Sequence, residues 1–193
     1  MSSAKTLSNT LNQEERQTLL SLAHDAITQG LEHQSPVKID PTVYPEHLQA
    51  TRAAFVTLHR NGQLRGCIGH LEAIQPLVQD VCDNAFAAAF RDPRFPPLSA
   101  NELADLELHI SVLTPSSPMN FSSEEDLLRQ LQPGIDGLIL EDGRYRGTFL
   151  PSVWEQLPNP TDFLRRLKQK AGLAPDYWSK SLTVRRYYTE SFP

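Results

Sequence analysis

The sequence predicts an α+β fold, in which helices flank a mainly antiparallel sheet. Three observations support this class: two turn pairs each join apolar strands, the helices carry clear capping signals, and strands and helices do not alternate as in parallel βαβ units. The chain has 193 residues, of which 39% are hydrophobic and 21% are charged. This length and composition suit one domain with its own core. Because strands and helices do not alternate, a Rossmann-type sheet is disfavoured.

Helices are predicted wherever a capping signal precedes apolar residues at helical spacing. They are expected over residues 12–32, 76–90, 99–105, 123–131 and 162–171. Asn12 and Glu15 form a capping-box pattern at the start of the first helix. The second begins at Pro76 and carries a wide apolar stripe, so we expect it to pack flat on the sheet. Residues 34–51 contain three prolines and are expected to form an extended loop.

Strands are predicted from alternating or continuous apolar runs bounded by turn residues. They are expected over residues 52–60, 63–71, 106–113, 137–140, 145–150 and 182–188. Asn61-Gly62 and Asp142-Gly143 are the turn pairs of two hairpins. In the 106–113 strand, alternation directs Leu108 and Ile110 toward the core and leaves Glu107 and His109 on a solvent-exposed face.

The strand after Asn61-Gly62 contains the hexapeptide LRGCIG, residues 64–69. Strict alternation assigns three of its residues to the core face: Leu64, Gly66 and Ile68. It assigns the other three to the opposite face: Arg65, Cys67 and Gly69. Arg65 and Cys67 would then lie about 7 Å apart on one face, where the guanidinium would favour the thiolate of Cys67.

Two interpretations of this segment remain open. Cys67 is either a reactive or ligand-contacting thiol in an anion-friendly cleft, or a small hydrophobic residue in a tight place. The glycines indicate a bulge or a close approach of another backbone or ligand. Cys82, inside the apolar stripe of its helix, is expected to be inert core.

The second candidate segment is DPRFPP, residues 92–97. It places Asp92, Arg94 and Phe95 on a loop stiffened by prolines. Such rigidity suits a binding site, because little entropy is lost when a ligand docks. The alternative is structural: Asp92 braces the loop through an arginine and Phe95 fills the core.

Net charge is −5, but residues 162–193 hold 7 basic and 3 acidic side chains. This basic end either binds RNA or another anion, or docks on the acidic body as a solvated face. No apolar stretch is long enough to span a bilayer and no signal-peptide core is visible, so the cytoplasm is the expected compartment.

Common cofactor and metal motifs are missing from the sequence. There is no P-loop, GxGxxG, GxSxG or HExxH pattern. Glu107, His109, Glu72 and His70 invite a metal hypothesis, but their spacing matches no ligand pattern. We therefore expect neither a metal nor a cofactor.

At the two candidate segments the chain resembles the AMMECR domain family, whose microbial members are called AmmeMemoRadiSam system protein A. LRGCIG is that family's signature, and DPRFPP matches a second signature block of the family. The resemblance covers about residues 12–192, although residues 152–160 depart from the family pattern. It implies one AMMECR domain over 12–193, with a smaller subdomain around 115–160 and a flexible N-terminus over 1–11.

The resemblance also implies a setting for the function. The family name reflects association with a Memo-like protein and a radical SAM protein, which are therefore candidate partners. The signature residues are expected to line a cleft: Arg65 and Cys67 as catalytic residues, and Gly66, Gly69, Asp92, Arg94 and Phe95 as substrate-binding residues. No settled reaction comes with the resemblance, so three hypotheses stand.

In the first hypothesis, Cys67 acts with Arg65 on a small anionic or RNA-linked substrate. In the second, the protein is a non-catalytic adaptor or binding module for a protein partner. In the third, RNA binds the basic C-terminal residues: Arg165, Arg166, Lys168, Lys170, Arg185 and Arg186. No membrane association is expected in any of them.

Overall fold

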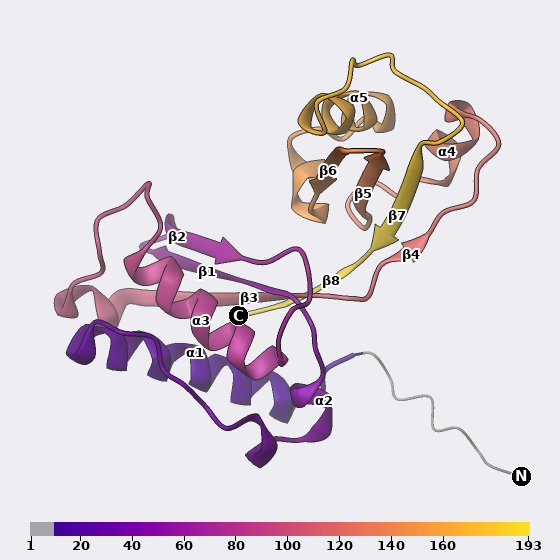
Figure 1. Ribbon diagram of the computed structural model, residues 1–193. Coiled ribbons are helices and arrows are strands. Elements are labelled where there is room, and N and C mark those ends of the chain that lie inside the picture. Colours follow the sequence, from indigo (N-terminus) through magenta and orange to yellow (C-terminus); the bar gives the residue numbers. More distant parts are fainter. Residues whose placement is uncertain (1–9) are drawn as a thin grey trace, which may run out of the picture. The chain divides into compact units, whose positions relative to one another are not determined.

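The computed structural model describes residues 10–193, which divide into two compact units (Figure 1). The first unit runs to Leu113 and also contains Glu190–Pro193. The second spans Thr114–Thr189. The expectation of a flexible N-terminus concerns residues that lie mostly outside the described range. Leu11, inside that range, is only 2% exposed, and its amide donates to the Glu190 carboxylate.

The first unit is a four-stranded sheet with two long helices packed on one face (Figure 1). Its strand order is β2-β1-β3-β8, from β1 (Ala54–Arg60), β2 (Gln63–Gly69), β3 (Leu106–Leu113) and β8 (Thr189–Phe192). The helices are α1 (Gln13–His33) and α3 (Leu77–Phe90). Three short helices complete the unit: η1 (Pro41–Val43), α2 (Glu46–Gln49) and η2 (Ala100–Asp105).

The core of this unit lies between the sheet and the two helices. The sheet contributes alternating residues of β1 and β3, and the helices contribute their apolar stripes. The central members are fully buried: Leu19, Ala23, Ile27, Val56, Leu58, Val81, Ala85, Ile110 and Val112. The predicted apolar stripe of the second helix is therefore what packs α3 on the sheet.

A β-bulge interrupts the β1–β2 hairpin. Leu58 pairs with Gly66, whereas His59 pairs with Leu64, so Arg65 is the extra residue of β2. Gly66 and Ile68 face the core and Cys67 faces away, as alternation predicts. Leu64 and Arg65 depart from that prediction because the bulge shifts the alternation by one residue, and Leu64 lies on the outer face, 42% exposed.

The second unit is a smaller antiparallel sheet with its own core. Its strand order is β4-β7-β5-β6, from β4 (Ser117–Pro118), β5 (Gly137–Asp142), β6 (Tyr145–Phe149) and β7 (Thr183–Tyr187). Its helices are α4 (Glu124–Gln130), η3 (Pro151–Glu155) and α5 (Pro160–Lys170). The ring of Trp154 stacks on that of Phe163, with centroids 3.7 Å apart, and both are buried in this core.

Several sequence expectations need correction at this level. The smaller subdomain extends to Thr189 rather than to about residue 160, because β7 pairs with β5 and α5 packs in the same core. The segment 34–51 holds η1 and α2 besides its loops. The helix expected over 162–171 begins at Pro160, and Asn159 caps it, since its side-chain oxygen accepts the amides of Thr161 and Asp162. The final predicted strand ends at Tyr187, and β8 follows it.

The α+β class itself is confirmed, with two antiparallel sheets in place of one. Within residues 10–193, none of the helices is long and apolar enough to cross a membrane.

Candidate functional site

The two signature segments meet at the outer edge of β2, which is an edge strand. The Cys67 amide donates to Asp92 Oδ2 at 2.9 Å, and Arg94 Nη2 donates to the Cys67 carbonyl at 3.3 Å. Asp92 also accepts the Arg94 amide and two guanidinium N–H groups. Side chains therefore satisfy the backbone groups that an exposed strand edge would leave unpaired. We call Asp92 and Arg94 the edge clamp.

The edge clamp is strongly charge-assisted. Asp92 is buried, and the hydrogen bond from the Arg94 side chain is the main cause that holds its pKa well below the ordinary value. The same bond is the main cause that raises the pKa of Arg94. The guanidinium of Arg94 is thus held against the backbone of Cys67.

Arg65 binds partners outside the edge clamp, Glu102 and the Pro96 carbonyl. Its Nε donates to Glu102 at 2.7 Å, and its Nη2 donates to Glu102 at 3.2 Å and to the Pro96 carbonyl at 2.9 Å. The hydrogen bond from Arg65 is the largest cause that lowers the pKa of Glu102, to about 2. A carboxylate therefore compensates the charge of Arg65, which ties the bulge of β2 to η2 and to the DPRFPP loop.

Both signature glycines have packing reasons. A Cβ on Gly66 would lie 2.1 Å from the Ala88 carbonyl oxygen of α3, and one on Gly69 would lie 2.6 Å from the Ala54 carbonyl oxygen. Both distances are shorter than a Cβ atom can adopt, so a residue other than glycine would force its neighbours to move. Phe95 lies beneath two cations, with Arg65 and Arg94 at 5.9 and 5.5 Å from its ring centroid. These residues build the local structure around Cys67.

The Cys67 side chain lies on the sheet face opposite the two long helices. Its Sγ is 3.2 Å from Thr57 Oγ1 on the neighbouring strand β1. Thr57 in turn pairs with His109 of β3. Cys67, Thr57 and His109 therefore form a row across three adjacent strands, and each is half-buried. In this row a thiol, a hydroxyl and an imidazole stand side by side.

A second imidazole lies next to this row. His59 packs edge-on against His109, with ring centroids 5.2 Å apart, and its Nδ1 is buried with no hydrogen-bond partner among the described residues. We call the outward-facing side chains of this sheet the open face. They comprise Phe55, Thr57, His59, Leu64, Cys67, Glu107, His109, Ser111 and Ser191.

Cys82 contrasts with Cys67. It is 1% exposed in the α3 stripe, and burial is the main cause that raises the pKa of its thiol to about 12. Cys82 therefore lies in the core, as predicted. Both cysteines are free thiols.

The residues of the metal hypothesis do not come together. His70 Nδ1 lies 2.7 Å from Asp80 Oδ1, on a different side of the hairpin from His109 and its partner His59. Over residues 10–193, no group of three or more His, Cys, Asp or Glu side chains could hold a metal ion.

Sequence reasoning missed Thr57 and His59 as members of this face. Alternation within the 52–60 strand would place both on one side, together with Phe55. What it could not supply is the pairing of β1 with β3, which brings His109 beside Thr57. That pairing joins residues about 50 positions apart in the chain, and no local signal carries it.

Half of the basic C-terminal residues are engaged inside the second unit. Lys168 is fully buried and donates to Glu124 at 2.7 Å. Arg186 pairs with Asp136 at 3.0 Å, and Arg185 donates to the hydroxyl and carbonyl of Ser116. Arg165, Arg166 and Lys170 remain exposed on α5. The candidate RNA surface is thus smaller than the sequence indicates.

Comparison with known proteins agrees with the signature segments. The chain matches the AMMECR1 family over residues 20–192. It is 37% identical over 184 residues to a protein of Methanothermobacter thermautotrophicus, covering 94% of this chain and 95% of that one. It is 41% identical over 145 residues to a protein of Methanosarcina acetivorans, covering 75% and 70% of the two chains.

A solved structure is similar over nearly the whole length. The crystal structure of an uncharacterised protein from Pyrococcus horikoshii superposes with a TM-score of 0.76 at 36% identity, covering 90% of this chain and 88% of that one. The signature segments lie in the first unit, and the similarity in sequence and in fold extends over both units. This protein therefore belongs to the AMMECR1 family.

Proposed function

We propose that this protein is a binding component of a modification system, in which it acts with Memo-like and radical SAM proteins. In this proposal the open face of the first unit takes up the partner or the substrate-bearing molecule. One observation carries the proposal: most of the signature residues that were expected to line a cleft instead make contacts within the fold. Four of them make such contacts: Arg65, Gly66, Asp92 and Arg94. These contacts hold the sheet face rigid.

Features of the open face support binding. The bulge at Arg65 turns Leu64 outward, next to His59. Leu64 is an exposed large hydrophobic residue at 42%, beside half-buried polar groups. An apolar anchor rimmed by hydrogen-bonding side chains is a common composition of protein-binding surfaces.

The test is a matched pair of charge insertions. Leu64→Lys places a cation on the open face, whereas Val43→Lys does the same at an exposed hydrophobic residue outside it, 73% exposed. We expect Leu64→Lys to weaken binding to a co-produced Memo-like protein at least tenfold, about 1.4 kcal/mol, and Val43→Lys to leave it unchanged. Titration calorimetry of the purified proteins measures both dissociation constants. Equal affinities for the two variants would contradict the proposal.

A reaction at the thiol is the second candidate function. The row formed by Cys67, Thr57 and His109 favours it, because a hydroxyl contacts the sulfur and an imidazole follows on the next strand. Such a thiolate would displace a leaving group from an electrophilic carbon of an anionic substrate. The S–C bond forms as the bond to the leaving group breaks, the leaving group departs with that electron pair, and Arg94 lies nearby to stabilise the negative charge.

Alkylation measures this directly, with Cys82 as the internal control. Iodoacetamide at neutral pH is expected to modify Cys67 in the folded protein and to leave Cys82 unmodified, as read by mass spectrometry of peptides. A catalytic row also predicts that His109→Gln slows Cys67 alkylation severalfold. If Cys67 reacted no faster in the folded protein than in the denatured chain, an activated nucleophile would be untenable, and the binding function would stand alone.

A further inference from the structure

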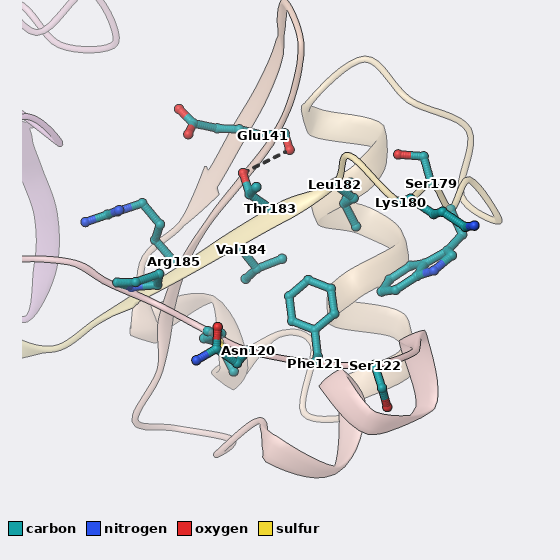
Figure 2. Close-up of a pocket in the computed structure, with 13 residues that line it drawn as sticks. Asn120, Phe121, Ser122, Glu141, Ser179, Lys180, Leu182, Thr183, Val184 and Arg185 are labelled. Atoms are coloured by element: carbon teal, nitrogen blue, oxygen red, sulfur yellow. Dashed lines mark hydrogen bonds between the residues drawn. The ribbon is translucent and has the colours of Figure 1, made fainter.

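The second unit contains a pocket that none of the signature residues line (Figure 2). Its volume is about 560 Å³, which is in the range of small-molecule sites. Three segments form its walls: residues 118–122, residues 178–180 and residues 182–185 of the β7 region, with Glu141 beside them. All of these lie within the second unit.

The walls of this pocket are held in place by hydrogen bonds. The Met119 amide donates to the Val184 carbonyl at 2.9 Å, which fixes the 118–122 segment to β7. On the other side, Asp142 accepts hydrogen bonds from the hydroxyls of Tyr177, Ser179 and Ser181. These bonds are the causes that lower the pKa of Asp142, that of Ser179 being the largest. The pocket is therefore preformed, which reduces the entropy lost on binding.

Two aromatic rings give the pocket its apolar character. Phe121 and Trp178 contact each other with centroids 5.6 Å apart and planes tilted by 58°. Figure 2 shows the Phe121 ring directed toward Val184 and Leu182, which are both buried. Lys168 supports the indole from within the core, with Nζ 5.6 Å from the ring centroid. Rings held in this way favour a planar aromatic ligand, through offset or edge-to-face contacts.

The pocket lining contains three charged side chains: Glu141, Lys180 and Arg185. Figure 2 shows the Glu141 carboxylate directed away from the Phe121 ring, and it pairs with Arg146 at 2.8 Å. Lys180 is exposed at the rim, two residues from Trp178. Arg185, also in the lining, uses Nε and Nη2 to bind Ser116. The pocket thus combines two aromatic side chains with one exposed cation, Lys180.

We propose that this pocket binds a planar aromatic molecule carrying a carboxylate or phosphate group. The aromatic part contacts Phe121 and Trp178, and the anionic group lies near Lys180. This site is independent of the open face, because it shares no residue with it.

Three probes test the two parts of the proposal by titration calorimetry. 1-Naphthoate has the ring and the anion, 1-naphthylmethylamine has the ring with a cation, and cyclohexanecarboxylate has the anion without the aromatic ring. We expect naphthoate to bind, and each of the other two to bind at least fivefold more weakly. Absence of naphthoate binding at millimolar concentration, or equal binding of the amine, would overturn the proposal.

Matched variants assign the binding to the pocket. Lys180→Glu is expected to weaken naphthoate binding at least fivefold, whereas Lys38→Glu, the same charge change at an exposed lysine of the first unit, leaves it unchanged. Both positions are exposed, so both variants should fold, which circular dichroism checks. If both variants weakened naphthoate binding equally, the change in net charge alone would explain the weakening, and the proposed site would be rejected. Leu64→Lys on the open face should leave naphthoate binding intact, which separates this proposal from the proposed function.

Discussion

Arg65 illustrates how one residue of a signature can act through structure. It lies at a bulge and is 9% exposed. Its guanidinium binds both oxygens of Glu102, and Glu102 also accepts the amide of Ser99 at 2.9 Å. The sequence prediction placed Arg65 beside Cys67 on one face. That face assignment is wrong because a bulge shifts alternation by one residue.

The Arg65–Glu102 pair predicts a pH-dependent stability. The pKa of Glu102 is lowered to about 2, chiefly by the hydrogen bond from Arg65. A lowered folded-state pKa stabilises the fold above the unfolded-state value, near 4.5, and that contribution disappears as the pH falls toward 2. Glu102→Gln should therefore lower the free energy of unfolding by about 2 kcal/mol at pH 7, and by progressively less below pH 4.5.

Denaturant unfolding at several pH values measures this difference. Glu46→Gln, at an exposed glutamate of the same unit, is the control and should change little at any pH. A Glu102→Gln effect that stayed constant down to the acid transition would show that the ion pair does not supply the stability.

At the scale of elements, β2 is held between a helix and a loop. α3 approaches it closely enough that the Ala88 carbonyl oxygen faces Gly66. At the free edge of β2, Asp92 and Arg94 bind the backbone of Cys67. Small residues of α3, among them Ala85, Ala88 and Ala89, permit this approach.

Gly66→Ala should therefore be strongly destabilising. The new Cβ would lie 2.1 Å from a backbone oxygen, so a helix rather than a side chain would have to move. We expect a loss of about 3 kcal/mol or failure to accumulate as folded protein. Gln63→Ala, at an exposed position of the same strand, is the control. Thermal unfolding of both variants measures the difference, and near-equal midpoints would contradict close packing of α3 on β2.

At the scale of the whole chain, the two units interleave in sequence. The chain leaves the first unit after Leu113 and returns to it at Glu190. There β8 joins the sheet beside β3, and Glu190 binds Leu11 and Arg16 at the start of α1. The first sheet is therefore completed only by the last residues described. The smaller subdomain, expected around 115–160, extends to Thr189 because α5 and β7 belong to its core and sheet.

The sequence by itself determined the α+β class, the hairpins, the helix stripes and the contrast between an outward Cys67 and a core Cys82. These follow from local signals: turn pairs, capping residues and the periods of strand and helix. Tertiary structure decided the rest. The bulge at Arg65, the clamp of Asp92 on Cys67 and the row that joins Cys67 to His109 all depend on which strands pair and in what register. Register is set by packing between segments far apart in the chain, so no local pattern encodes it.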